Sequence, residues 1–151
     1  MDQPNRPTIV VLCGSTRFTE LFREANLRET LAGKIVLSVG CDTKADTQIW
    51  PSKEEREGVK AMLDRLHLKK IELGDEILVL DGTRYYCPYY ERWLDQPGMC
   101  PVCQPNLIHQ LEWRSYIGDS TRREIEHATI LGKRIRYHSR EQHDKKEVKN
   151  G

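Results

Sequence analysis

The strongest constraint on the fold is a short apolar run that ends in a glycine turn near the N-terminus. Residues 8–13 read TIVVLC, and Gly14 and Ser15 follow at once. A continuous β-branched run of this length predicts a strand that is buried on both faces, as in a parallel sheet. Apolar residues at helical spacing follow over residues 18–25. The segment therefore predicts a strand–turn–helix unit.

The same pattern continues along the chain. Strands are predicted over residues 35–39 and 76–80, and a fourth over residues 134–137, after the last helix and Gly132. Ser52 and Glu55 have the spacing of a capping box, and they predict the start of a helix between the second and third strands. The buried stripe of that helix is predicted to consist of its regularly spaced apolar residues, Val59, Met62, Leu63 and Leu66.

Strands that alternate with helices predict a parallel sheet with right-handed crossovers. We therefore expect an α/β fold, a Rossmann-like or flavodoxin-like open sheet of four to five parallel strands with helices on both faces. Ligands of such sheets bind beyond the carboxyl ends of the strands. Three segments follow those ends: residues 14–17, residues 41–46 with Asp42 as a candidate ligand-binding residue, and residues 81–124.

The chain is expected to form one domain over residues 1–137, because its 151 residues suit a single hydrophobic core. Residues 82–115 interrupt the alternation with prolines, cysteines and aromatic residues, and are expected to be an irregular insertion before the last helix. Residues 138–151 are highly charged and are expected to form a mobile tail.

Charge and hydropathy exclude several classes of protein. The formal net charge is +1, which argues against a large surface that recruits nucleic acid. No apolar run approaches the roughly 20 residues that span a bilayer, and the polar N-terminus lacks a signal-peptide core. We therefore expect a cytoplasmic protein without membrane or nucleic-acid partners, whose five cysteines stay thiols or metal ligands.

The first candidate ligand site is the turn formed by Gly14, Ser15, Thr16 and Arg17. Glycine lets the backbone approach a ligand, the following helix N-terminus offers N–H groups, and the arginine suits phosphate. The alternative is a tight turn in which serine or threonine caps the helix. Position alone does not decide between the two interpretations.

The second candidate site precedes a helix predicted over residues 121–131, in a segment that reads GDSTRRE. Thr121 and Glu124 have the spacing of a capping box, which explains both residues without any catalysis. A carboxylate in the first turn would also lie over the carboxyl edge of the sheet. The helix N-terminus would keep it ionised there, as a nucleophile requires. Spacing alone favours the cap.

The insertion contains a cysteine pair, Cys100 and Cys103, at the spacing that zinc knuckles use. Cys87 and His109 could complete a tetrahedral set of ligands. A structural zinc ion would stabilise a segment that is poor in aliphatic residues. The alternative is an aromatic-rich loop whose cysteines hold no metal, and whose tyrosines pack or stack on a nucleobase.

Three blocks of sequence together resemble the nucleoside 2-deoxyribosyltransferase-like superfamily, which includes N-glycosidases of nucleoside 5′-monophosphates. The first block is residues 11–17 (VLCGSTR) and the second is residues 73–80 (LGDEILVL). The third comprises residues 118–121 (GDST), 124–128 (EIEHA) and 132–135 (GKRI). The likeness covers most of the chain outside the insertion and the tail.

The resemblance implies which residues bind and react. The glutamate of the third block is the family's nucleophile and matches Glu124, which outweighs the capping interpretation. The family's glycine turn holds the sugar and, in the monophosphate enzymes, the phosphate; its match is Gly14, Ser15 and Arg17. The serine or threonine just before the glutamate also contacts the ligand in the family, which points to Ser120 and Thr121. Gly118 and Asp119, directly before them, are expected in the same binding site.

The chain departs from the family at one position. Many members carry an aspartate in the helix before the third strand, which positions the sugar or assists proton transfer, and His67 stands there in this chain. His67 and Asp64, one turn away, are the candidates that give a proton to the leaving base. By its place in the helix, His67 also suits a structural role as a partly buried histidine with a hydrogen bond.

Residues and resemblance together predict a nucleoside or nucleoside 5′-monophosphate N-glycosidase or deoxyribosyltransferase. The resemblance implies a homodimer and no cofactor for catalysis. The alternative is a non-catalytic nucleotide-binding module whose zinc-like insertion serves as a partner surface. A nucleic-acid accessory protein is a third interpretation, and the near-neutral charge disfavours it.

Overall fold

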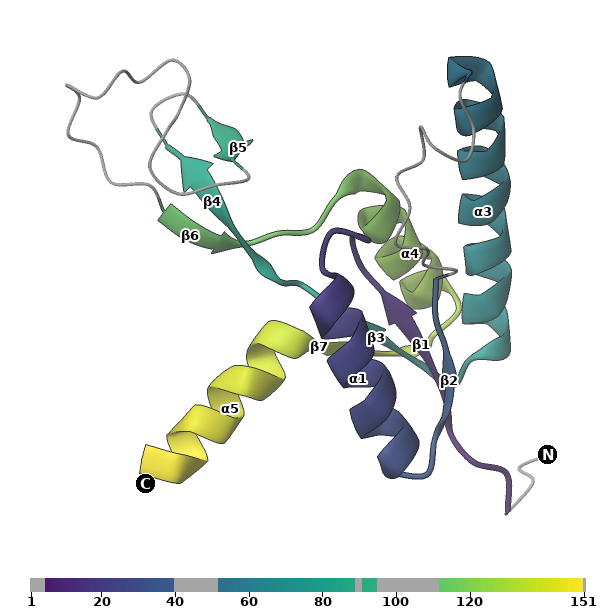
Figure 1. Cartoon of the computed structure of the whole chain (residues 1–151). Helices are drawn as coiled ribbons and strands as arrows, with labels where there is room; N and C mark the ends of the chain where they lie inside the picture. The colour runs from purple at the N-terminus through teal and green to yellow at the C-terminus, as the bar shows by residue number, and fades with distance from the viewer. Residues whose placement is uncertain (1–4, 40–51, 89–90, 95–111, 151) are drawn as a thin grey trace, which may run out of the picture.

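In the computed structural model, residues 5–39, 52–88, 91–94 and 112–150 are described. Their main sheet contains four parallel strands in the order β2-β1-β3-β7 (Figure 1). The strands are β1 (Ile9–Cys13), β2 (Ile35–Leu37), β3 (Glu76–Val79) and β7 (Arg134–Tyr137). The predicted α/β class with an open parallel sheet is confirmed, and each predicted strand is present.

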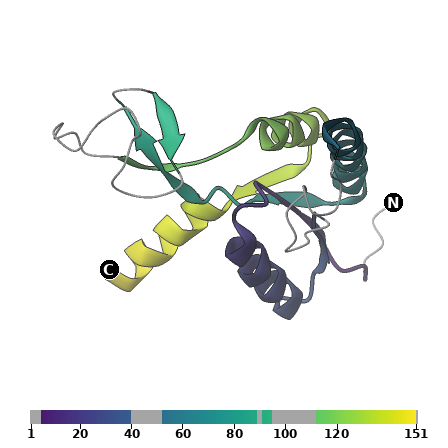
Figure 2. The ribbon, with the colours of Figure 1, turned by 45° about the horizontal axis from the view of Figure 1, so that its top comes forward.

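Helices cover both faces of this sheet (Figures 1 and 2). α1 (Thr19–Leu31) packs on one face, and α3 (Lys53–Leu73) and α4 (Asp119–Ile130) pack on the other. Because successive strand residues point to opposite faces, β1 directs Leu12 toward α1 and Cys13 toward the α3–α4 pair. Within the described residues, no helix combines the length and apolar character of a membrane span.

α3 packs through a different face from the predicted one. Ser52 Oγ accepts a hydrogen bond from the backbone N of Glu55 at 3.0 Å, so the predicted N-cap is confirmed. The helix buries His67 and Ile71 instead of its apolar stripe. The predicted stripe is wrong, because its members are half-buried or exposed: Val59, Met62, Leu63 and Leu66. α3 extends past the sheet (Figure 1), so its contact with α4 decides which side is covered.

The insertion contains regular structure. β4 (Thr83–Cys87), β5 (Arg92–Leu94) and β6 (Glu112–Ser115) form an antiparallel sheet in the order β5-β4-β6, which extends away from the main sheet (Figures 1 and 2). Tyr85 packs on Trp113 across this sheet, with ring centroids 4.3 Å apart. The described part of the insertion is therefore a small sheet with paired aromatic residues, and the expectation of an irregular segment is wrong. Pairs between strands join residues that are distant in sequence, so they produce no periodic pattern of apolar residues within any one strand.

α5 (His138–Asn150) occupies most of the segment that was expected to form a mobile tail. Its first turn is held by the carboxylate of Asp81, which follows β3. Asp81 accepts hydrogen bonds from the backbone N of Ser139 at 2.9 Å, from Ser139 Oγ, and from Ser115 Oγ at 3.0 Å. Asp81 therefore joins the end of β3 to both α5 and the insertion sheet.

A buried ion network lies on the α1 face of the main sheet. Arg136 of β7 lies 2.6 Å from Glu29 of α1 and 3.0 Å from Glu76 of β3, and Lys34 contacts the same two carboxylates at 3.0 and 2.9 Å. Burial raises the pKa of Glu29, but hydrogen bonds from Arg136 and Lys34 outweigh it, so that pKa is lowered from its ordinary value. The network ties α1 to two strands of the sheet.

Candidate active site

The candidate site begins where β1 ends. Gly14 starts the turn after this strand and passes close to the residue that follows β3. A Cβ at Gly14 would lie 3.0 Å from the carbonyl oxygen of Leu80. Any larger residue would therefore push the turn away from the sheet.

The hydroxyl of Ser15 is bonded within the turn. Ser15 Oγ accepts hydrogen bonds from the backbone N and the Nε of Arg17 at 3.4 and 3.2 Å. Thr19 Oγ1 donates to the carbonyl oxygen of Thr16 at 3.1 Å. α1 begins only at Thr19, with Phe18 at the N-cap position and no side-chain cap. The interpretation of Ser15 or Thr16 as the helix cap is therefore wrong.

Arg17 faces the insertion sheet. Its guanidinium lies 5.3 Å from the ring centroid of Tyr116, and the guanidinium of Arg84 lies 4.5 Å from the same centroid. Both arginines line a cavity of about 230 Å³, together with Tyr85, Trp113 and other residues. Arginine and aromatic side chains together suit a ligand that combines a negative charge with a ring.

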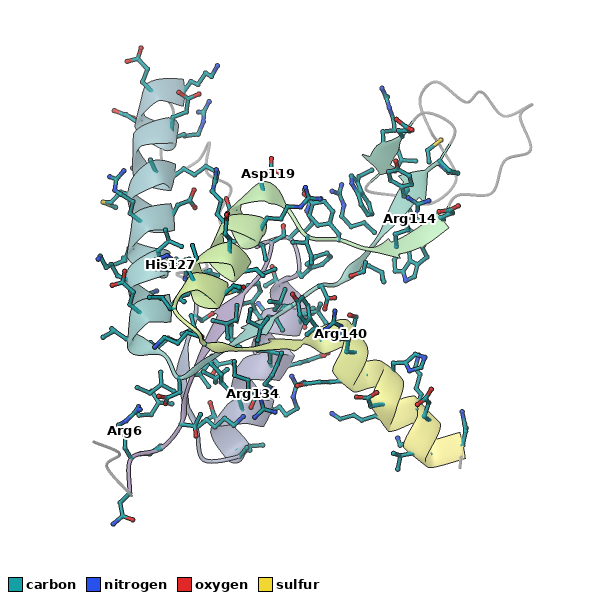
Figure 3. All side chains as sticks on the ribbon, turned by 180° about the vertical axis from the view of Figure 1, so that it is seen from behind. Arg6, Arg114, Asp119, His127, Arg134 and Arg140 are labelled. Atoms are coloured by element: carbon teal, nitrogen blue, oxygen red, sulfur yellow. The ribbon has the colours of Figure 1, made fainter. Side chains whose placement is uncertain are left out.

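Glu124 lies inside α4 rather than at its cap. The helix begins at Asp119, with Gly118 as its N-cap, and Figure 3 shows Asp119 in the first turn. The capping-box interpretation is therefore wrong. Thr121 and Glu124 are three residues apart, and both are buried on one face of the helix with Ala128.

Glu124 meets one residue of β1 and one of α3, and the three form the Cys13–His67–Glu124 cluster. His67 Nε2 lies 3.9 Å from Glu124 Oε1 and 3.5 Å from Cys13 Sγ. The three potential ligand atoms all lie within 4.8 Å of one another, and all three residues are buried. Because Cys13 directly precedes Gly14, the cluster brings the Glu124 carboxylate beside the glycine turn.

Burial changes the proton affinity of each member of the cluster. It raises the pKa of Glu124 to about 7, against a hydrogen bond from Cys13 that lowers it. Burial and the positive charge of Lys70 lower the pKa of His67 to about 4. Burial and the negative charge of Glu124 raise the pKa of the Cys13 thiol. At neutral pH the imidazole and the thiol are therefore neutral, and Glu124 titrates.

A polar rim surrounds the first turn of α4. Lys60 Nζ lies 3.2 Å from both Ser120 Oγ and Asp64 Oδ2. Arg123 Nη2 lies 3.3 Å from the same hydroxyl and 3.6 Å from the same carboxylate. The side chains of Lys60 and Arg123 are exposed, so the rim presents positive charge to an anion that arrives from solvent.

Part of the predicted site is brought together, and part lies outside the described residues. Glu124, His67 and the Gly14 turn meet at one edge of the sheet, with Ser120 and Asp64 at the rim. Four of the predicted site residues lie outside the described ranges: Asp42, Cys100, Cys103 and His109. Of the predicted zinc ligands, Cys87 is described, and it is buried at the end of β4.

Two further site residues, Cys13 and Lys60, are not singled out by the sequence patterns. A signal for Cys13 exists, since it ends a buried strand directly before a glycine turn. A signal for Lys60 exists as well, because its spacing of four and then three residues to Asp64 and His67 places all three on one helix face.

Figure 3 shows another histidine, His127, on the side of α4 toward α3, where its Nε2 lies 3.4 Å from Glu72 Oε1.

Comparisons with known proteins leave the family open. No protein-family model matches the chain, and no curated protein and no solved structure shows significant similarity to it. The resemblance to the nucleoside 2-deoxyribosyltransferase-like superfamily therefore stays a prediction, which rests on the three sequence blocks.

Proposed function

We propose that the protein is an N-glycosidase or deoxyribosyltransferase of nucleosides or nucleoside 5′-monophosphates, with Glu124 as the nucleophile. The observation that carries the proposal is the position of the Glu124 carboxylate, which is buried at the carboxyl edge of a parallel sheet beside the glycine turn. Its partner His67 is neutral at pH 7, so burial of this carboxylate is costly. Costs of this kind concentrate at functional sites.

In the proposed reaction, the ionised Glu124 attacks the anomeric carbon of a bound sugar while the bond from that carbon to the base nitrogen breaks. The electron pair of that bond leaves with the base, which takes up a proton. The carboxylate stabilises the positive charge that develops on the sugar ring. Water then opens the glycosyl ester in a hydrolase, and a second base opens it in a transferase.

The structure supports a positioning role for His67 more than a role as proton donor. With a pKa of about 4, its imidazole carries no extra proton at neutral pH. Its Nε2 lies 3.9 Å from Glu124 Oε1, where a small shift would let it hold the carboxylate by a hydrogen bond. Asp64 at the solvent edge of the rim is the remaining candidate for proton transfer to the base.

Arg17 is proposed to hold a 5′-phosphate, because it lies in the glycine turn and lines the cavity beside the insertion sheet. Ser15 of the same turn and Ser120, at the start of α4, are proposed to help hold this phosphate. A homodimer remains part of this proposal, on the ground of the resemblance.

Incubation of the full chain with a panel of nucleosides and nucleoside 5′-monophosphates tests the proposed function. We expect chromatography to show free base from at least one compound of the panel. Binding without release of base would support the non-catalytic nucleotide-binding module instead. A panel that yields neither binding nor free base would contradict both proposals.

The pH dependence of the reaction follows from the buried carboxylate. Below about pH 7, kcat/KM for base release is expected to rise about tenfold per pH unit and then to level off. The reason is that only ionised Glu124 attacks, and burial raises its pKa to about 7. The titratable and charged groups that act on it are Cys13 of β1, Lys60, Asp64 and His67 of α3, and Arg123 of α4. Initial rates across this range measure the effect, and a profile that is flat through pH 7 would contradict it.

A further inference from the structure

The Cys13–His67–Glu124 cluster gathers a thiol, an imidazole and a carboxylate from three different elements of the fold. Cys13 ends β1, His67 belongs to α3 and Glu124 belongs to α4. These elements pack around the apolar core on one face of the sheet, so the cluster is held by the fold and not by a loop. The three side chain types are those that bind zinc in proteins.

We propose that Cys13, His67 and Glu124 form a binding site for Zn²⁺, separate from the cysteine pair of the insertion. A tetrahedral zinc ion with a Zn–S bond of about 2.3 Å and a Zn–N bond of about 2.0 Å holds sulfur and nitrogen about 3.5 Å apart. Cys13 Sγ and His67 Nε2 are 3.5 Å apart, which matches this edge of the tetrahedron.

The carboxylate needs only a small movement to complete the set. A nitrogen and an oxygen bound to the same zinc ion lie about 3.3 Å apart, whereas His67 Nε2 and Glu124 Oε1 are 3.9 Å apart. Rotation of the carboxylate can close this gap. Within the described residues, Glu124 Oε2 is buried and has no hydrogen-bond partner, so the carboxylate has an unused acceptor.

Three protein ligands leave the fourth position of a tetrahedral ion open to water, as in catalytic zinc sites. The thiol binds as a thiolate, and its proton passes to solvent when the ion enters. A bound ion would also engage the carboxylate that attacks the sugar and lower its reactivity, so Zn²⁺ is expected to inhibit base release. This consequence rests on the proposed function, whereas metal binding itself does not.

Titration of the metal-free full chain with Co²⁺, followed by absorption spectroscopy, tests the site. The titration uses a Cys100→Ser, Cys103→Ser background, so that the cysteine pair of the insertion does not contribute. We expect a near-ultraviolet thiolate-to-cobalt band and visible bands of tetrahedral cobalt that saturate at one equivalent. Zn²⁺ is expected to displace the cobalt and abolish both. Absence of the thiolate band would overturn the proposal.

Single substitutions in this background assign the ligands. Cys13→Ala is expected to abolish the thiolate band. Glu124→Gln keeps the core intact and is expected to weaken Co²⁺ binding at least about tenfold. Even substitutions of residues that only contact a metal ligand cause losses of this size. His127→Gln, at a partly buried histidine that contacts Glu72, is the matched control and should bind as the background does. Unchanged binding in both the Cys13 and the Glu124 variants would overturn the site.

The metal site and the glycosidase can fail independently. If Co²⁺ binds as expected but no compound of the panel releases base, the proposed function fails and the metal site stands. If base is released and no cobalt band forms, the metal site fails alone. Release of base that Zn²⁺ inhibits and a chelator restores, in the same background, is the result expected when both hold.

Discussion

Replacement of Glu124 by glutamine is expected to lower kcat for base release by roughly 10³-fold or more while binding of the nucleotide is retained. Glutamine has nearly the shape of glutamate, but its neutral amide neither attacks the anomeric carbon nor stabilises positive charge on the sugar ring. Initial rates give the loss, and calorimetric titration with the same nucleotide gives the affinity.

Glu126→Gln is the matched control for this substitution. Glu126 lies two residues further along α4 and is exposed, so the same chemical change there removes a carboxylate that faces solvent. The rate of this control is expected to equal that of the natural chain. A Glu124→Gln chain that still turns over at the natural rate would end the assignment of Glu124 as nucleophile.

The stability of the same variant separates lost chemistry from lost folding. The unfolded chain releases the Glu124 proton near its ordinary pKa of 4.5, while the folded chain keeps it up to about 7. The free energy of unfolding of the natural chain therefore falls as pH rises between these values. Glutamine has no such proton, so above about pH 7 the variant is expected to be more stable by roughly 3 kcal/mol. Urea unfolding at about pH 5 and pH 8 measures the difference.

The centre of the sheet was predictable because its two central strands have a clear local pattern. β1 and β3 are runs of buried apolar residues between charged or glycine-containing segments, and they appear where the runs predict them. The face of α3 was not predictable in this way. Its apolar stripe is half-buried or exposed, and His67 is buried instead, because contact with α4 and the end of β1 decides which side is covered. That contact joins segments that are far apart in the sequence.

The site was predictable through residue types and only partly through geometry. The spacing of Thr121 and Glu124 suggested a cap, and the structure differs because α4 begins earlier, at Asp119. The earlier start places Glu124 in the second turn of the helix, where it is buried with Thr121 and Ala128. Cys13 belongs to the site only because β1 ends beneath α4, which no pattern within either segment records.

Arg136→Leu is expected to lower the free energy of unfolding by about 3 kcal/mol, because it leaves buried carboxylates without their main partner. Arg136 lies 2.6 Å from Glu29 and 3.0 Å from Glu76, and its side chain is only 15% exposed. Lys34 remains in contact with both glutamates, so the loss of unfolding free energy stays near the lower end of the range that is typical when one partner of a buried ion pair is removed. Urea unfolding near neutral pH measures the change.

Arg134→Leu provides the matched control, since Arg134 lies in the same strand and also contacts Glu76, at 3.7 Å, but is 76% exposed. An exposed pair of this kind contributes little to the free energy of unfolding, so its loss is expected to stay below about 0.5 kcal/mol.

Acid should reduce the effect of Arg136→Leu. The pKa of Glu29 is lower in the folded chain than its ordinary value of 4.5, so its ionised carboxylate stabilises the fold at pH values above 4.5. This contribution is lost as the pH falls through the pKa of Glu29 in the folded chain. Equal losses in the two arginine variants, or a loss for Arg136→Leu that does not shrink in acid, would show that charge compensation is not what holds α1 to the sheet.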